Sequence, residues 1–206
     1  MPIMRKSARN TDTALSARRA AKEASHERIV SAAALAIRRS GYDGTGVADI
    51  MREAGLTHGA FYAHFTSRED MLAEAADRAC AESAAAAAEA AAGAPRGRAL
   101  ESMLRAYLSR EHVEHAERGC PLVALGSETP RQTPEVRRAT TRYIKEMIDL
   151  LARQSPDWGQ PGTHEQALVT IATMVGALLL ARAVDEPALS DRLREAALKR
   201  LLPTGT

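Results

Sequence analysis

An alanine-rich tract, residues 71–92, is the feature that most constrains the fold of this chain. Alanine has the highest helix propensity of all residues, and the tract contains neither proline nor glycine. Ser67 and Asp70 stand just before it in the S-x-x-D spacing of a helix start, and Gly93 and Pro95 follow it. The tract therefore predicts one long helix rather than a linker.

Helical signals also dominate the rest of the chain, and strand signals are nearly absent. Capping residues, apolar spacing and Gly or Pro breaks predict further helices over residues 25–41, 46–55, 57–64, 98–116, 121–129, 134–154, 163–184 and 190–202. We therefore expect an all-α fold of about nine helices, in which three short helices precede a larger helical bundle.

The N-terminal segment, residues 1–24, carries six basic side chains and two acidic ones, a local charge of +4 in a chain whose net charge is +2. Two interpretations stay open: a solvated, disordered extension, or a basic arm that contacts phosphates. The start of the segment lacks the apolar core of a signal peptide.

The longest apolar run extends from Leu168 to Val184 and includes Arg182. Its 17 residues fall short of the roughly 20 that a membrane span needs, so we expect a buried helix and no membrane partner. Cys80 and Cys120 show no paired spacing, which fits a reducing compartment better than a disulfide framework. The sequence therefore predicts a cytoplasmic protein.

Three of the seven aromatic residues lie within five positions, at Phe61, Tyr62 and Phe65. On a helix Phe61 and Phe65 share one face, and we expect them to pack against apolar residues of the first two helices, such as Ile29. Tyr62 and His64 would then point away from that core. This is either an ordinary amphipathic helix of a bundle or the second helix of a helix-turn-helix, which enters the major groove of DNA.

The stretch "GYDGTGVADIMREAGLTHGAFYAHFTSREDML" resembles the DNA-binding domain of TetR-type transcriptional regulators. The pattern runs in register from about Ser25 to Leu72, with "AG", a short turn, "FYxHF" and "S-[RK]-E" in place. These elements are specific in combination, whereas a lone helix-turn-helix pattern would be weak. The form "LTHGxFYxHF" of the recognition helix resembles one subgroup of that family.

The resemblance implies an all-helical homodimer that binds palindromic double-stranded DNA and releases it when a small-molecule effector occupies the C-terminal domain. It divides the chain into a flexible basic extension, residues 1–24, a helix-turn-helix domain, residues 25–70, and a ligand-binding and dimerisation domain, residues 71–206. It predicts a transcriptional repressor rather than an enzyme.

The same resemblance assigns roles within the DNA-binding domain. The residues expected to hold phosphates are Thr57, Tyr62, His64 and Arg68. The residues expected to face bases are His58, Gly59, Ala60 and Ala63. Thr45 would touch the DNA backbone, and Ala48 matches a position that carries a base-reading polar side chain in some relatives. Since only His58 offers a strong polar group to bases from the recognition helix, we expect methyl contacts, water or DNA shape to supply much of the readout.

Apolar residues at three- or four-residue spacing continue beyond residue 93 and predict a core, part of which lines a ligand cavity. The candidate ligand-binding residues are Met103, Tyr107, Cys120, Leu125, Glu128, Tyr143, Met147, Met174 and Leu178. The helices 163–184 and 190–202 carry apolar residues, and Gly176 and Ala177 permit close helix approach, so we expect the homodimer interface there. A core within one protomer would account for some of the same residues.

His112, His115 and Cys120 permit two further interpretations. The His-x-x-His spacing brings two imidazoles near one helix face, but no fourth ligand is spaced for zinc, so a solvated polar face is preferred to a metal site. A small helical enzyme that uses one of the three as base or nucleophile is the alternative function, although no orienting third group can be placed. No cofactor is expected.

Cys120 stands directly before Pro121, a residue type favoured at the first position of a helix. The amide end of that helix, together with Arg118, would favour a thiolate that reacts with electrophiles. The alternative is an inert thiol, since free cysteine is among the most buried residue types.

Overall fold

The computed structural model describes residues 5–202, with side chains from residue 16 onward, and the regular structure in this range is entirely helical. The α-helices are α1 (Arg5–Ser40), α2 (Val47–Glu53), α3 (Arg68–Ala92), α4 (Ala99–Tyr107), α5 (Arg110–Glu114), α6 (Pro121–Leu125), α7 (Pro134–Gln154), α8 (Thr163–Ala183) and α9 (Pro187–Leu201). The 3-10 helices are η1 (His58–Ala63), η2 (Ala116–Arg118) and η3 (Thr129–Arg131). The prediction of an all-α fold with about nine helices is confirmed for the described range.

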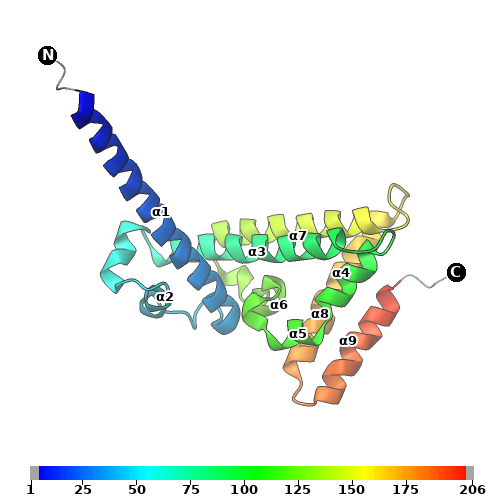
Figure 1. Ribbon diagram of the computed structural model, residues 1–206. Coiled ribbons are helices and arrows are strands. Elements are labelled where there is room, and N and C mark those ends of the chain that lie inside the picture. The colour runs from blue at the N-terminus through cyan, green and yellow to red at the C-terminus, as the bar shows by residue number, and fades with distance from the viewer. Residues whose placement is uncertain (1–4, 203–206) are drawn as a thin grey trace.

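The long helix α3 joins two regions of the molecule (Figure 1). α1, α2 and η1 gather around the first turns of α3. In the C-terminal region α7 lies alongside α3 and α4 packs against it, while α8 packs against α7 and α9 packs against α8. Each region has its own apolar core. Phe61 and Phe65 are buried in the first core together with Ile29, Ile37 and Ile50, as predicted.

Helix α3 begins and ends where the sequence predicts. The Ser67 hydroxyl accepts a hydrogen bond from the Asp70 amide at 3.0 Å, which satisfies one of the free N–H groups of the first turn. The helix continues to Ala92, and Gly93 is its C-cap.

Helix α1 is about twice as long as predicted, because it begins at Arg5 rather than at Ser25. Residues 5–24, expected to be a flexible extension, are its first half, and Ser25 lies inside the helix. The segment contains no glycine or proline, and lengthening an existing helix carries no new nucleation cost. Arg19 and Glu23, four residues apart, also pair at 3.0 Å.

Three other helices differ from the sequence prediction. The helix expected over 121–129 ends at Leu125, with Gly126 as its C-cap. The segment expected to be one helix over 98–116 breaks at Leu108, because the Ser109 hydroxyl accepts a hydrogen bond from the His112 amide at 3.1 Å and starts α5. The segment after Thr57 is a short 3-10 helix rather than an α-helix.

Helix α8 is long and apolar enough to cross a membrane by length and composition, with a mean hydropathy of 1.6. In the fold it packs against α7 and α9. The expectation of a buried helix holds for one side of α8 only, because the other side leaves large apolar residues exposed. These residues are Leu168, Val169, Leu179 and Leu180.

Candidate DNA-binding surface and ligand cavity

α2 and η1 form a helix-turn-helix around Gly55. Gly55 has φ +70°, a conformation that costs a residue with a Cβ about 1 kcal/mol or more. The turn is closed by hydrogen bonds from the Gly55 amide to the Arg52 carbonyl and from the Leu56 amide to the Met51 carbonyl. Ile50 of α2 and Phe61 of η1 lie in the same buried core, so packing in that core fixes the angle between the two helices.

The outward face of η1 carries most of the residues predicted to contact DNA. Thr57, His58, Gly59 and Ala63 are exposed, and Tyr62 is 73% exposed. Ala60 is half-buried, and Ala48 is exposed on α2. The Thr57 hydroxyl makes no capping hydrogen bond with the described residues, so it is free to donate to a phosphate. Gly59, Ala60 and Ala63 are small residues, which suits close approach of the backbone to a groove.

His64 does not point outward as expected. Its ring is half-buried beside α1, with its centroid 5.8 Å from that of His26, which in turn stacks on Phe65 at 4.7 Å. Burial, the charge of His26 and the charge of Lys22 lower its pKa. Its Nδ1 is enclosed and lacks a hydrogen-bond partner within residues 5–202. His64 therefore joins η1 to α1, and a phosphate contact would have to come from the rest of its ring.

Thr45 is turned into the protein rather than towards DNA, and the half-buried Arg68 uses one guanidinium nitrogen within the protein. The Thr45 side chain is buried, and its hydroxyl donates to the Gly41 carbonyl at 2.7 Å. The Arg68 guanidinium donates to the carbonyls of Tyr42 and Thr45, the latter at 3.1 Å. The sequence assigned both side chains to phosphates, but their polar atoms hold the loop between α1 and α2 against the start of α3.

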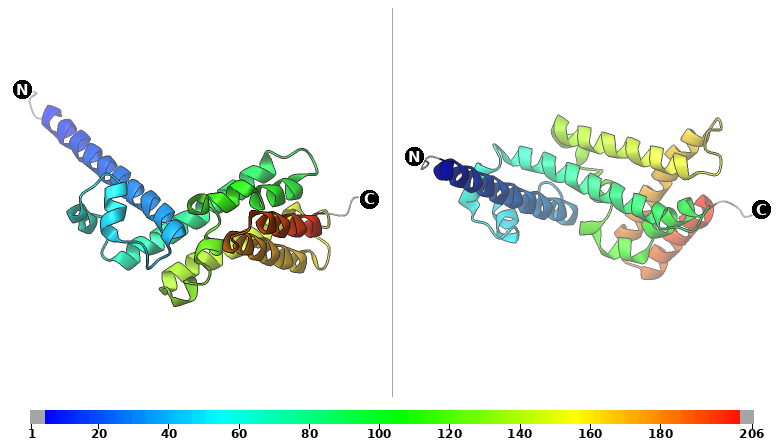
Figure 2. Two further views of the ribbon diagram at one scale, coloured as in Figure 1. Left: turned by 90° about the horizontal axis from the view of Figure 1, so that it is seen from below. Right: turned by 45° about the horizontal axis from the view of Figure 1, so that its top comes forward.

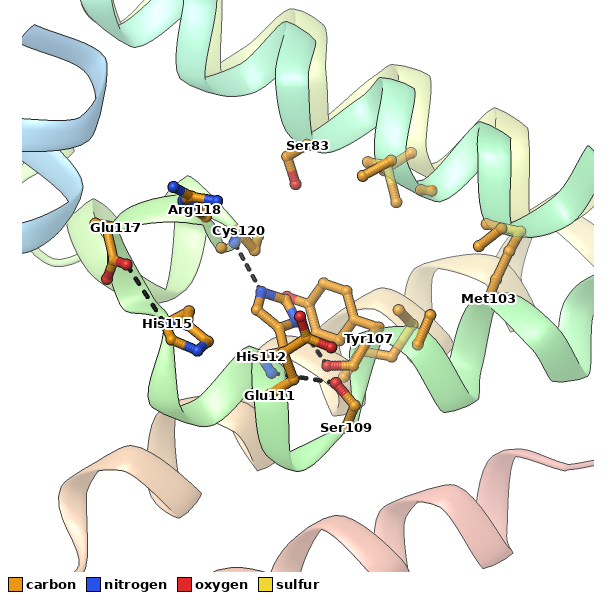
Figure 3. Close-up of a pocket in the computed structure, with 17 residues that line it drawn as sticks. Ser83, Met103, Tyr107, Ser109, Glu111, His112, His115, Glu117, Arg118 and Cys120 are labelled. Carbon is orange, nitrogen blue, oxygen red and sulfur yellow. Dashed lines mark hydrogen bonds and ion pairs between the residues drawn. The ribbon is translucent and has the colours of Figure 1, made fainter. Parts of the chain in front are cut away.

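A cavity of about 500 Å³ lies in the C-terminal region, between α3, α4, α7, α8 and the segment 109–120 (Figure 3). Its apolar wall consists mainly of α3 alanines and of methionines. Five of the nine candidate ligand residues line it. These five are Met103, Tyr107, Cys120, Met147 and Met174.

The other four candidates lie elsewhere. Tyr143 is buried behind the wall, where its hydroxyl pairs with the Ser83 hydroxyl at 2.8 Å. Leu125 is buried in the first core, and Leu178 is fully buried within the protomer. Glu128 accepts a hydrogen bond from the Tyr42 amide at 2.8 Å, so it bridges to the DNA-binding region. Helical spacing identified Leu125, Tyr143 and Leu178 as core residues but could not show which core residues face the cavity.

His112 stands at the polar end of the cavity, where Figure 3 shows it between Tyr107 and Cys120. Its Nδ1 lies 2.7 Å from the Tyr107 carbonyl, and its Nε2 accepts the Cys120 amide at 2.9 Å. These two bonds require the neutral tautomer with hydrogen on Nδ1. Burial is the main reason that its pKa falls to about 4, and the charge of Arg182 acts in the same direction. The preferred interpretation as a solvated polar face is wrong for His112, and the break at Ser109 that turns it inward was the missed signal.

Tyr107 presents an enclosed polar atom at the cavity. Its ring meets that of His112 edge-on, with centroids 4.8 Å apart. Its hydroxyl is enclosed and makes no hydrogen bond to any group in the described chain. A buried hydroxyl without a partner costs about 1–3 kcal/mol, so a ligand that accepts a hydrogen bond there would recover that energy.

Cys120 is the N-cap of α6 and Pro121 its first residue, as predicted. The thiol is only 1% exposed, and its Sγ lies 3.4 Å from the Tyr143 hydroxyl. Both nitrogens of His112 are engaged, and His115, at the rim, is 3.5 Å from Glu117. The arrangement does not supply a nucleophile with a free base beside it. Among the described residues no group of His, Cys, Asp or Glu is placed to hold a metal ion.

Comparison with protein families matches both regions of the chain. Residues 29–75 match the model of bacterial regulatory proteins of the tetR family, and residues 96–196 match the C-terminal domain model of LmrA/YxaF-like transcriptional regulators. An uncharacterised HTH-type transcriptional regulator of Mycobacterium tuberculosis is 32% identical over 165 residues, which cover 76% of this chain and 83% of that relative.

Solved structures share the fold. A TetR transcriptional regulator from Chloroflexus aurantiacus is 28% identical with a TM-score of 0.72, over 87% of this chain and 93% of its own. A TetR-family regulator from Agrobacterium tumefaciens is 22% identical with a TM-score of 0.72, over 88% and 100%. The reduced form of E. coli NemR is 21% identical with a TM-score of 0.70, over 86% and 94%.

Proposed function

This chain belongs to the TetR family of bacterial transcriptional regulators, and we propose that it is a repressor that binds a palindromic operator as a homodimer and releases it when a small apolar molecule fills the cavity. In this proposal residues 25–70 bind DNA, residues 71–206 bind the effector and dimerise, and the "LTHGAFYAHF" stretch marks its subgroup. The supporting observation is that one short segment connects the cavity wall to the helix-turn-helix.

That segment runs from residue 119 to residue 128. Gly119 and Cys120 line the cavity, and α6 follows directly. At the end of α6, Leu125 is buried in the core of the DNA-binding region, and Glu128 bonds to the Tyr42 amide. A ligand that displaces the cavity wall therefore shifts a contact of the loop that carries α2.

On the DNA side we propose a reduced set of contacts. Thr57 and Tyr62 bind phosphates and set the position of η1 in the groove, since their side chains are exposed and polar. His58 faces a base edge, and Gly59 and Ala63 allow close approach. Thr45 and Arg68 act indirectly, because their hydrogen bonds to carbonyls of the loop between α1 and α2 hold that loop in position.

The cavity favours an apolar effector with one hydrogen-bond acceptor. Alanine and methionine side chains form most of its apolar wall, and among the groups that line it the Tyr107 hydroxyl is the enclosed polar atom that lacks a partner in the described chain. Cys120 also lines it, so an electrophile that alkylates the thiol is a second route to release. Wild-type protein and Cys120→Ser should respond equally to an apolar effector, whereas only the wild type should respond to an electrophile.

The exposed apolar side of α8 supports the homodimer. Leu168, Val169, Leu179 and Leu180 are exposed in one protomer and lie along one side of the helix. Large apolar residues that line up on a surface indicate an interaction site. We propose that α8 of one protomer packs against α8 of its partner, with α9 beside it, as in a four-helix interface.

The test is selection of the DNA site from a random duplex pool, followed by fluorescence anisotropy with the selected duplex. We expect a palindromic site bound by two protomers, with affinity that falls steeply as salt rises. Native mass spectrometry of the purified protein should reveal any apolar molecule retained in the cavity. Selection of no duplex above the random pool would contradict the proposal.

A further inference from the structure

The first half of α1 projects beyond the helix-turn-helix, away from the C-terminal region (Figure 1). Both further views show the same placement, with the start of α1 at the end of the molecule that holds α2 and η1 (Figure 2). Twenty helical residues span roughly 30 Å. Every described side chain from Ser16 to Ala24 is exposed.

A helix in that position gains little from the rest of its own protomer. Short helices in water are marginal, and most helices in proteins depend on tertiary packing of one face. The Arg19–Glu23 pair within the segment is exposed, and such a surface pair contributes little to stability. The projecting segment therefore has most to gain from an external partner.

The positive charge of the N-terminal segment, residues 1–24, favours an anionic partner. Residues 1–24 carry a charge of +4, and because the whole chain is +2, the remaining residues sum to −2. From Ser16 to Ala24 the segment consists of serine, alanine and charged residues. It offers no aromatic or large aliphatic side chain there for insertion into a membrane surface.

The position of two basic residues connects the segment to the DNA-binding surface. Arg18, Lys22 and His26 are spaced four apart, so they follow one face of α1. His26 stacks on Phe65 and lies beside His64 of the recognition segment. Lys22 is close enough to act on the pKa of His64. His26 itself pairs with the Glu74 carboxylate at 2.7 Å, so Arg18 and Lys22 are the basic residues that continue outward from η1 along this face.

We propose that Arg18 and Lys22 form an additional DNA contact, which binds phosphates of the duplex flanking each operator half-site. This inference rests on the proposed function, because it assumes that η1 reads the operator. The contact recognises the charge of the backbone and carries no base preference. The contact extends the length of duplex that the protein binds, and it raises affinity without changing the preferred sequence.

The experiment compares two duplexes in full-length protein: the selected palindrome alone, and the palindrome with about ten flanking base pairs on each side, roughly one helical turn. The test variant is Arg18→Ala with Lys22→Ala. The control is Arg96→Ala with Arg153→Ala, which removes the same charge from exposed positions in the α3–α4 loop and the last turn of α7. Affinities are measured by anisotropy over a range of salt concentrations.

We expect wild type and control to bind the long duplex at least tenfold more tightly than the short one, and the test variant to bind both equally. Four lost phosphate contacts per dimer should reduce the slope of log K against log salt by about 3 to 4 on the long duplex. The preferred sequence of the test variant should be unchanged. A test variant that keeps the wild-type preference for the long duplex and the wild-type salt slope would overturn the inference.

Two further outcomes separate this inference from its alternatives. If wild type binds the selected palindrome but shows no gain from the flanks, the proposed function stands and the additional contact does not. If wild type instead binds vesicles of phosphatidylglycerol, and the double variant loses that binding without any effect of the flanks on DNA affinity, the segment recognises lipid and the DNA contact is excluded.

Discussion

The Glu128 carboxylate occupies a space that Gly41 leaves open, since a Cβ at position 41 would lie 2.5 Å from its Oε1. Its Oε2 accepts the Tyr42 amide at 2.8 Å, and Arg68 donates to the Tyr42 carbonyl. Tyr42, in the loop after α1, is thus held through its amide by Glu128 of the C-terminal region and through its carbonyl by Arg68 at the start of α3. This clamp, formed by Glu128 and Arg68 on Tyr42, connects the C-terminal region directly to the loop that precedes the helix-turn-helix.

Removing the carboxylate should weaken both the fold and the operator complex. Glu128→Ala leaves the Tyr42 amide without its acceptor, and an unmade hydrogen bond of this kind costs about 1–3 kcal/mol. Glu128→Gln keeps an acceptor oxygen and should lose less. Urea unfolding and anisotropy with the selected operator measure the two effects. Unchanged operator affinity and unchanged effector response in Glu128→Ala would show that the clamp transmits nothing.

Two substitutions on η1 should separate positioning from specificity. Tyr62→Ala should lower affinity for all DNA sequences by a similar factor, because Tyr62 is 73% exposed and is proposed to bind phosphate. His58→Ala should change the preferred base at one position in each half-site, with a discrimination loss of about 1–3 kcal/mol. Site selection repeated with each variant is the measurement. An unaltered preference in His58→Ala would remove it from the base-facing set.

Charge on the exposed side of α8 should separate the protomers without unfolding them. Val169 and Leu180 are 57% and 50% exposed in one chain, so glutamate at either site is tolerated by a monomer but buries an unpaired carboxylate in the proposed interface. Light scattering should report monomers for Val169→Glu and Leu180→Glu, with normal circular dichroism. Ala88→Glu, on an exposed position of α3, is the control and should remain dimeric. Leu178 is unsuitable because it is fully buried within the protomer.

Removing the Tyr107 hydroxyl should have opposite effects on stability and on ligand binding. Tyr107→Phe eliminates an enclosed hydroxyl without a partner in the described chain, so the free energy of unfolding should be equal to that of wild type or about 1 kcal/mol higher. Affinity for the compound recovered by native mass spectrometry should fall. Thermal unfolding and calorimetric titration measure the two quantities. A ligand affinity equal to that of wild type would show that the effector does not use this group.

The free energy of unfolding should fall on acidification because of His112. Its pKa is about 4 in the folded protein and about 6.5 in an unfolded chain, so below pH 6.5 the unfolded state binds more protons. The His112 contribution is therefore complete above pH 6.5 and is lost as pH falls towards 4, by at most about 1.4 kcal/mol per pH unit. His64, whose pKa is also lowered, acts in the same direction.

The matched comparison is wild type against His112→Gln, since His64 contributes equally to the pH dependence of stability in both proteins. Urea unfolding at a series of pH values should give a difference between the two proteins that shrinks below pH 6.5. A constant difference from pH 7 to pH 4.5 would contradict the buried neutral imidazole.

Local sequence determined the helical class and the start of α3. The tract 71–92 has one stable local conformation, because alanine favours helix and Ser67 caps its first turn whatever surrounds it. The same holds for Pro121 at the start of α6 and for the buried faces of Phe61 and Phe65, which follow from helical spacing. These features depend on residues a few positions apart in the chain.

Only the tertiary structure decided which polar side chains are free to act. Arg68 and Thr45 stand in the family pattern beside DNA-contacting residues, yet their donors satisfy carbonyls that lie more than twenty residues away or across a turn. His112 was expected to face solvent and instead closes a cavity, because Tyr107 and Cys120 engage both its nitrogens. A hydrogen bond forms only when two segments are positioned to within a few tenths of an ångström of the required distance. Helical spacing shows which face of a helix a residue occupies, but it does not show which other segment packs against that face.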